Sequence, residues 1–355
     1  MRIALICPYS RGSLRGNIIT VRRITGFLRQ AGLEVLAVAA DSCDARDMES
    51  QLDAFKPDLL HGFNACHSGP LTRQLAERLH IPYLITLTGS DFNDPGQRNH
   101  PDTGAALNGA AAIVCFSPLD AERFGGFFPS LQGMVTVIPQ GVAPLPVDSD
   151  DTFGIDPTEY VLLLPAALRP VKGVEFPLKA LSQPGIDSHN LRLVFVGGVI
   201  DAEYAGTVFE LLKGAPHATW LGEVGHGRMG SLYARADLVL NCSGYESMPN
   251  SLLEAMALGR PVLAADIPGN RSLITPGVTG WLYDGEADFR RFVTLIAEHP
   301  HLREEVGRNA GVFVQNSFSP QREAAGYISL YSALRGSIQK AGRSFDENLS
   351  EGIMV

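Results

Sequence analysis

Short apolar runs alternate with segments of helical periodicity along the whole chain. Runs of this length, bounded by turn residues, are typical of buried strands, and their alternation with helices predicts parallel sheets covered by helices. In the first half the pattern predicts helices over 17–30, 70–79 and 118–124, and strands near 2–7, 33–39, 58–61, 82–87, 112–116 and 134–138.

A proline-rich and acidic segment, residues 143–151, interrupts this pattern and is typical of a linker between domains. A chain of 355 residues is long enough for two domains. We therefore expect an N-terminal Rossmann-like domain over 1–145, a linker over 146–158 and a second Rossmann-like domain over 159–317. The second half predicts strands at 160–164, 191–197, 237–241 and 261–264, and helices at 174–182, 204–214, 226–235, 249–258, 286–298 and 319–335.

Composition and charge narrow the class of protein. The 45% apolar and 19% charged residues are those of an ordinary globular protein, and the net charge of −9 argues against a nucleic-acid binder. Five cysteines without a Cys-x-x-Cys pair indicate free thiols in a reducing compartment. No apolar run is long enough for a membrane span or a signal peptide. These features predict a cytoplasmic protein and leave peripheral membrane contact open.

Two glutamates, Glu246 and Glu254, are the strongest candidates for chemistry. Pro249 suits the first position of a helix, and Gly259 suits the residue that ends it. Glu246 would then lie in the loop before the helix and Glu254 on the helix itself. The free N–H groups of a helix start attract a diphosphate, and carboxylates accept hydrogen bonds from sugar hydroxyls. Taken by themselves, the two residues favour a simpler interpretation, in which Glu246 is a surface glutamate before a helix and Glu254 is a helical glutamate paired with an arginine.

The run from Glu246 to Val262 resembles the Glu-x7-Glu motif of the GT-B glycosyltransferases of family 4, down to its Leu-Leu-Glu-Ala-Met-Ala-Leu-Gly-Arg-Pro-Val end. The resemblance covers nearly the whole chain. It implies an α/β fold of two doubly wound Rossmann-like domains facing a central cleft. It also implies that a helix over 318–336 returns to the first domain, ahead of a tail over 337–355 that we expect to be flexible. The implied activity is sugar transfer, with retention, from a nucleotide-diphosphate donor to an unidentified acceptor.

Arg169 and Lys172 follow the first strand of the second domain. A guanidinium and an ammonium group three residues apart can contact one anion, although the same pair also occurs on solvated turns. In the family this pair grips the donor diphosphate. The resemblance therefore assigns Arg169, Lys172 and Glu246 to catalysis, with a UDP-sugar favoured as the donor and with no cofactor or divalent metal required.

The resemblance also assigns residues to the donor. The Gly-rich turn near Gly16 opens the first helix and lets the backbone approach a ligand. It is not a Gly-x-Gly-x-x-Gly fingerprint, which disfavours a nicotinamide enzyme. Gly197 belongs to a turn that approaches the nucleotide in this family, and Glu223 to a segment that borders the base. The expected donor-binding residues are Gly16, Gly197, Glu223, Ser247, Met248 and Glu254.

The acceptor side is less defined. Thr88 stands where family members carry a histidine, so this chain lacks the side chain that performs the usual role of that histidine in the family. His61 suits a proton shuttle or a structural hydrogen bond, and Asp91 suits either the acceptor or a turn. Asp148 and Asp150 spell a metal motif but fall in the linker, so we interpret them as solvated. The acceptor-side candidates are Asn17, His61, Thr88, Asp91 and Asn93.

Two other functions are alternatives to sugar transfer. Loss of the histidine at Thr88 would suit a nucleotide-sugar binder without turnover. A nucleotide-sugar 2-epimerase can use the same architecture, but the chain lacks a convincing set of acids and histidines for proton abstraction. The Thr-Gly-Ser-Asp and Ile-Pro-Gly-Asn elements resemble a narrower branch that includes selenosugar synthases. The sequence leaves the sugar, the base, the acceptor and the oligomeric state open.

Overall fold

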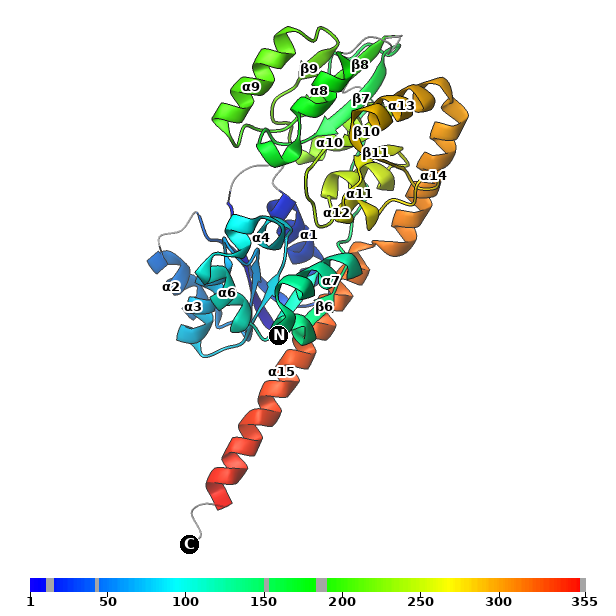
Figure 1. Cartoon of the computed structure of the whole chain (residues 1–355). Helices are drawn as coiled ribbons and strands as arrows, with labels where there is room; N and C mark the ends of the chain where they lie inside the picture. Colours follow the sequence, from blue (N-terminus) through cyan, green and yellow to red (C-terminus); the bar gives the residue numbers. More distant parts are fainter. Residues whose placement is uncertain (11–15, 42–44, 150–152, 183–189, 352–355) are drawn as a thin grey trace.

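The computed structural model describes residues 1–10, 16–41, 45–149, 153–182 and 190–351, with the backbone alone at 45 and over 337–351. It contains two six-stranded sheets whose strands are all parallel (Figure 1). Each sheet separates two clusters of buried apolar side chains, which helices cover. The expected α/β class with two doubly wound sheets is therefore confirmed.

The first sheet has the strand order β2-β1-β3-β4-β5-β6. All six predicted strands are present, while the helices α2 and α6 were not predicted because few apolar residues mark their buried faces. The strands are β1 Arg2–Cys7, β2 Glu34–Ala39, β3 Leu59–Phe63, β4 Tyr83–Thr86, β5 Ala112–Cys115 and β6 Val135–Val137. The helices are α1 Gly16–Gln30, α2 Ala45–Phe55, α3 Gly69–Leu79, α4 Ser90–Asn93, α5 Pro95–Arg98, α6 Pro101–Asn108, α7 Pro118–Phe127 and η1 Pro129–Met134.

The second sheet has the order β12-β11-β10-β7-β8-β9. Its two edge strands were not predicted because three residues are too few for a visible pattern. The strands are β7 Tyr160–Pro165, β8 Leu191–Val196, β9 Ala218–Trp220, β10 Leu238–Asn241, β11 Val262–Ala265 and β12 Trp281–Tyr283. The helices are η2 Pro170–Lys172, α8 Glu175–Leu181, α9 Ala202–Lys213, η3 His226–Arg228, α10 Met229–Arg235, α11 Asn250–Ala257, α12 Pro268–Arg271, α13 Gly285–Glu298 and α14 Pro300–Ser317.

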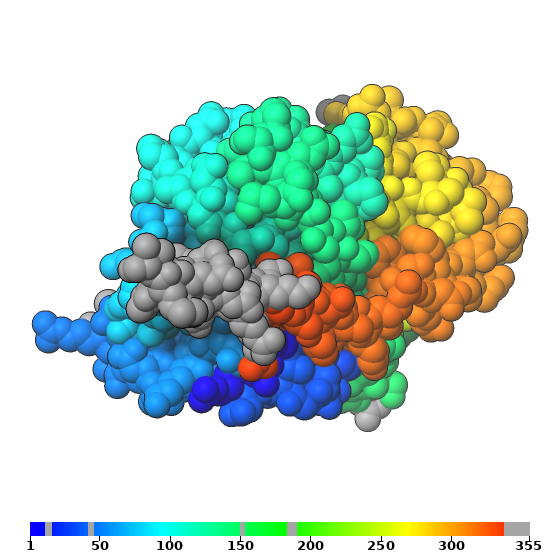
Figure 2. Space-filling model, turned by 90° about the horizontal axis from the view of Figure 1, so that it is seen from below, coloured from blue at the N-terminus to red at the C-terminus, as the bar shows by residue number. Residues whose placement is uncertain are grey.

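The chain passes from the first sheet to the second between β6 and β7, and returns after α14. The two passages touch, because the N–H of Val142 donates to the carbonyl oxygen of Phe318 at 2.7 Å. A Cβ on Gly141 would lie 2.5 Å from the Cα of Pro320, so only glycine fits there. Helix α15, Pro320–Glu351, then packs on α1, and Figure 2 shows it in orange-red beside the blue start of the chain.

The segment over 337–355, which we expected to be a flexible tail, is helical for most of its length. The backbone of α15 continues as helix to Glu351, beyond the body of the molecule (Figure 1). Gly336 was taken as the helix end, but a single glycine costs a helix only about 1 kcal/mol, and good helix formers follow it. Residues 352–355 lie outside the described part of the chain.

Helices long enough and apolar enough to cross a membrane do not occur in the described residues.

Candidate active site

A cavity of about 220 Å³ lies between the two sheets. Thr88 and Phe116, which follow β4 and β5, line it from the first sheet, and Ala166 and Arg169, which follow β7, line it from the second. Parallel α/β sheets bind ligands at the carboxyl ends of their strands, where side chains from neighbouring loops converge. The cavity is therefore placed where both sheets can contribute to one ligand.

Arg169 and Lys172, the two candidate cations from the sequence, both line the cavity. The turn that carries them ends at Gly173, whose φ is +56° and whose added Cβ would lie 2.4 Å from the carbonyl oxygen of Cys242. Only glycine tolerates both conditions, which fixes the turn against β10. The buried Nε of Arg169 has no hydrogen-bond partner among the described residues. A guanidinium that is exposed to the cavity and incompletely paired is suited to an anionic ligand.

Glu246 lies beside these cations. One of its carboxylate oxygens accepts hydrogen bonds from Lys172 Nζ and, at 2.7 Å, from Ser243 Oγ. Burial raises the pKa of Glu246, but the charge and hydrogen bond of Lys172 outweigh it and hold the pKa below its ordinary value. Glu246 is thus an ionised acceptor of hydrogen bonds at neutral pH.

Glu254 lines the cavity from α11 and is 6% exposed. Its carboxylate accepts hydrogen bonds from Tyr233 Oη at 2.9 Å and contacts His226 Nε2 at 2.7 Å. Burial and the charge of Glu254 raise the pKa of Tyr233 far above its ordinary value, so the phenol remains a donor. The sequence did not indicate Tyr233 or His226, because nothing in the residues around them shows that they contact Glu254 of α11.

The ends of α11 differ slightly from expectation. Pro249 precedes the helix as its N-cap, with φ −72° and ψ 119°, and the first helical residue is Asn250. Gly259 follows the helix with φ +67°, as predicted. The N-terminus of α11 therefore faces the cavity, with Met248 and Asn250 in the lining.

The donor-side candidates divide into two groups. Gly16, Met248 and Glu254 line the cavity, whereas Ser247, Gly197 and Glu223 are not among its lining residues. Ser247 is buried and its hydroxyl donates to the carboxylate of Asp120, on α7. Gly197 accommodates the carbonyl oxygen of Ala166, which would lie 2.2 Å from an added Cβ. Glu223 is exposed on the loop after β9. Ser247 and Gly197 thus have structural contacts outside the cavity lining, and Glu223 also lies outside that lining.

The acceptor-side candidates divide in the same way. Asn17 and Thr88 line the cavity, and the hydroxyl of Thr88 accepts a hydrogen bond from Asn64 Nδ2 at 3.0 Å. His61 does not face the cavity. It is fully buried within β3, between Tyr331 Oη and Thr86 Oγ1, each at 2.7 Å. Burial lowers its pKa well below the ordinary value, so His61 is a neutral structural residue.

Asp91 and Asn93 also have structural positions. The fully buried carboxylate of Asp91 accepts hydrogen bonds from the backbone N–H groups of Ala65 and Gly89, both at 2.9 Å, and from that of Thr88. Asn93 Nδ2 donates to the carbonyl oxygen of Gly89 at 2.9 Å. Both side chains hold the turn that presents Thr88, which is the second of the two roles that the sequence left open.

The structure adds little on two sequence motifs, the Asp148 and Asp150 pair and the Gly-rich turn before α1. No group of three or more His, Cys, Asp and Glu side chains within the described ranges is placed to hold a metal ion. The N–H of Asp148 donates to Ser231 Oγ at 2.9 Å, and Asp150 lies outside the described residues. The same holds for the part of the Gly-rich turn from 11 to 15.

Comparison with known proteins agrees with this geometry. Residues 148–312 match the family model described as glycosyl transferases group 1. The chain is 26% identical over 332 residues to glycosyltransferase 1 domain-containing protein 1 of Xenopus tropicalis, covering 89% of this chain and 93% of that protein. It is also 26% identical over 309 residues to D-inositol 3-phosphate glycosyltransferase of Segniliparus rotundus, covering 80% of this chain and 68% of that protein.

Solved structures show the same fold. Sucrose-phosphate synthase from Thermosynechococcus elongatus superposes with a TM-score of 0.80 at 21% identity, over 95% of this chain and 99% of that one. Alr3699/HepE of Anabaena, in complex with UDP and glucose, superposes with a TM-score of 0.76 at 17% identity, over 94% of this chain and 100% of that one. Residues 148–312 are therefore a domain of the glycosyl transferases of group 1, and the protein is a glycosyltransferase with the GT-B fold.

Proposed function

We propose that the protein transfers a sugar, with retention of anomeric configuration, from a nucleotide-diphosphate donor to a hydroxyl-bearing acceptor. The observation that carries this proposal is the meeting of Arg169, Lys172, Glu246 and Glu254 in one cavity. Two cations and two carboxylates in one cavity match a ligand with a diphosphate at its centre and hydroxyl groups on both sides. The resemblance to family 4 supports retention.

The diphosphate end would lie against Arg169 and Lys172, near the N-terminus of α11. In the reaction the bond between the anomeric carbon and the diphosphate oxygen breaks, and a bond to the acceptor oxygen forms. The acceptor loses its proton, and the departing diphosphate gains negative charge. The two cations and the helix N-terminus stabilise that charge, so that the proposal requires no divalent metal.

The hydroxyl ends would lie against the carboxylates. Glu254 is held by Tyr233 in a fixed position and suits a ribose diol, while Glu246 suits the hydroxyls of the transferred sugar. UDP is the favoured nucleotide, which the complexes of Alr3699/HepE with UDP and with UDP-glucose support. The acceptor would enter between Asn17 and Thr88, on the wall formed by the first sheet.

Isothermal titration calorimetry of the full chain with UDP, GDP, ADP and their glucose derivatives tests the donor site. We expect one nucleotide to bind and the Glu254→Ala variant to lose at least tenfold in affinity, because the ribose loses a charged acceptor of its hydrogen bonds. Glu203→Ala, which removes an exposed carboxylate on α9, is the matched control and should bind as the wild type does.

Turnover separates the rival functions. Donor consumption that disappears in Lys172→Ala supports a transferase, whereas binding without any turnover would favour a nucleotide-sugar binder. An isomerised nucleotide sugar formed from the donor alone would favour an epimerase. Equal affinity of the wild type and Glu254→Ala would contradict the placement of the ribose.

A further inference from the structure

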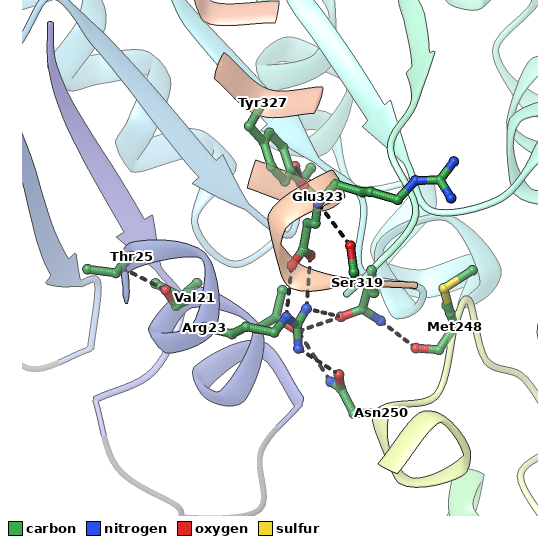
Figure 3. A network of polar contacts seen from close by, with 12 residues as sticks. Val21, Arg23, Thr25, Met248, Asn250, Ser319, Glu323 and Tyr327 are labelled. Atoms are coloured by element: carbon green, nitrogen blue, oxygen red, sulfur yellow. Dashed lines mark hydrogen bonds and ion pairs between the residues drawn. The ribbon is translucent and has the colours of Figure 1, made fainter. Parts of the chain in front are cut away.

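The guanidinium of Arg23 lies where three distant segments of the chain meet (Figure 3). Arg23 is on α1 and forms a two-pronged ion pair with Glu323 of α15, with Nε–Oε2 at 2.8 Å and Nη2–Oε1 at 2.9 Å. Its Nη1 donates to Asn250 Oδ1 of α11 at 3.1 Å. One side chain of α1 thus contacts both α15, which packs on α1, and α11, the helix that carries Glu254.

Gln140 completes this contact from the passage between the sheets. Its Oε1 accepts hydrogen bonds from Arg23 Nη2 at 3.2 Å and from Thr20 Oγ1 at 2.6 Å. Its Nε2 donates to the carbonyl oxygen of Met248 at 2.5 Å. Asn250 Nδ2 in turn donates to Thr20 Oγ1 at 3.2 Å. We call Thr20, Arg23, Gln140, Asn250 and Glu323 the α11 latch.

The ion pair in the latch is almost fully shielded from solvent. The side chain of Arg23 is 10% exposed and that of Glu323 is 1% exposed. Burial lowers the pKa of Arg23, but Glu323 outweighs this effect and raises the pKa above its ordinary value, so the guanidinium is charged. Buried ion pairs add little stability compared with apolar side chains of the same volume, because both charges lose their hydration. A role in fixing geometry explains the pair better than a role in stability.

The latch adjoins the candidate active site. Thr20, Gln140, Met248 and Asn250 line the cavity together with Glu254, although Arg23 itself does not. Asn250 and Glu254 are four residues apart and therefore lie on one side of α11. Glu254 itself is held by Tyr233 and His226, both from the same half of the chain as α11. The latch is thus not needed to hold Glu254, but it joins the N-terminus of α11 to α1.

We infer that Arg23 is a positioning residue which fixes the register between the two walls of the cavity through Asn250 and Gln140. This inference rests on the proposed function. Without the latch, Glu254 keeps its contacts with Tyr233 and His226, and the protein still binds the nucleotide. The N-terminus of α1 and the side of the cavity lined by Asn17 and Thr88 no longer close over that nucleotide. Water then enters, and the field of Arg169 and Lys172 on the departing diphosphate is weakened.

Two variants break the latch in different ways. Asn250→Ala removes the contact on α11 while leaving the ion pair in place. The double variant Arg23→Gln with Glu323→Gln removes both charges together, which avoids leaving one charge buried and unpaired. Arg22→Ala is the matched control, because Arg22 is the exposed neighbour of Arg23 on α1.

With UDP-glucose as the probe, we expect kcat for hydrolysis to fall about 10–100-fold in both latch variants while KM stays within about twofold, as a misplacement of reacting groups predicts. When Asn250→Ala is added to the double variant Arg23→Gln with Glu323→Gln, kcat should fall no further than in the more affected of the two latch variants, because Asn250 and Arg23 act through one contact. Small-angle X-ray scattering of the ligand-free proteins should show a larger radius of gyration for the latch variants than for the wild type and Arg22→Ala.

Several results would overturn the inference. These are an unchanged kcat, a KM that rises by the same factor as kcat falls, additive losses in the combined variant, or an unchanged radius of gyration. If the wild type binds none of UDP, GDP, ADP and their glucose derivatives, the proposed function fails, and scattering alone then decides whether the latch closes the cavity. If Glu254→Ala loses donor binding but the latch variants behave as wild type, the inference fails and the proposed function stands.

Discussion

Lys172 contacts a carboxylate of the protein and borders the space in which a diphosphate would bind. Replacing it with alanine should lower kcat about 10²–10³-fold, the usual loss when one group that stabilises developing negative charge is removed. Steady-state turnover of the nucleotide sugar measures this effect.

Lys179→Ala is the control for Lys172, because Lys179 is exposed on the neighbouring α8. A decrease in kcat of less than threefold for Lys172→Ala would mean that the ammonium group only neutralises Glu246.

The carboxyl group of Asp120 should make the free energy of unfolding depend on pH. Burial raises its pKa from 3.8 to about 6, against the opposing effect of the hydrogen bond from Ser247. Between these two values the folded state binds more protons than the unfolded state, so the free energy of unfolding falls as pH rises. Asp120→Asn has no such titration. Its stability relative to the wild type should therefore increase by on the order of 2–3 kcal/mol between pH 4 and pH 7.

Urea denaturation of both proteins at several pH values measures this difference. Asp102→Asn is the control, because Asp102 is exposed on α6 and should give no such trend. Parallel curves for the wild type and Asp120→Asn would show that the carboxyl group titrates at an ordinary pKa.

At the scale of elements, α15 is the segment that joins the end of the chain to the first sheet. Its Tyr331 is fully buried against His61 of β3, with the phenol oxygen 2.7 Å from His61 Nδ1. Tyr331→Phe leaves that ring nitrogen buried without its partner, so it should cost about 1–3 kcal/mol of unfolding free energy. Ser332→Ala on the exposed side of α15 should change it by less than about 0.5 kcal/mol.

Chemical denaturation followed by circular dichroism gives both values. A change of less than about 0.5 kcal/mol in Tyr331→Phe would mean that water replaces the phenol, and that α15 is held by its apolar contacts alone.

The sequence predicted elements well where burial imposes a pattern. Central strands such as β1 and β7 carry a continuous apolar run, so their position and type were clear. The edge strands β9 and β12 are too short to show periodicity. Helix α14 was also missed, since its buried side includes Gly307 and Gly311, which pack against Gly259 and carry no hydrophobic signal. Backbone packing of this kind leaves no mark in an apolar pattern.

At the scale of the whole molecule, contacts cross between the two sheets at several points. Ser247 donates to Asp120, and a Cβ on Gly89 would lie 3.2 Å from the backbone nitrogen of Ser247. We therefore expect a single thermal unfolding transition that shifts as a unit when UDP binds. At ~100 times its dissociation constant a ligand adds ~2.7 kcal/mol of stability.

Differential scanning calorimetry with and without UDP tests this coupling. Two transitions, of which only one responds to UDP, would show that the contacts between the sheets do not couple their unfolding.

The candidate site could be predicted only where sequence neighbours share a turn or a helix. Arg169 with Lys172, and Glu246 with Glu254, belong to such local patterns. Tyr233, Arg23 and Glu323 reach the site or its edge through tertiary packing, and no local spacing connects them. For His61 and Asp91 the sequence left a ligand-facing and a structural role open, because a polar residue at a strand end has the same sequence signature whether it faces a ligand or a buried partner.

The pairing of the two passages between the sheets limits how the molecule can move. Since Val142 is hydrogen-bonded to Phe318 and Gly141 packs on Pro320, the two crossings cannot slide past one another or separate independently. We therefore expect the two sheets to move relative to one another mainly by rotation about this pair. A side chain at position 141, outside the cavity lining, should then alter how far the cavity opens.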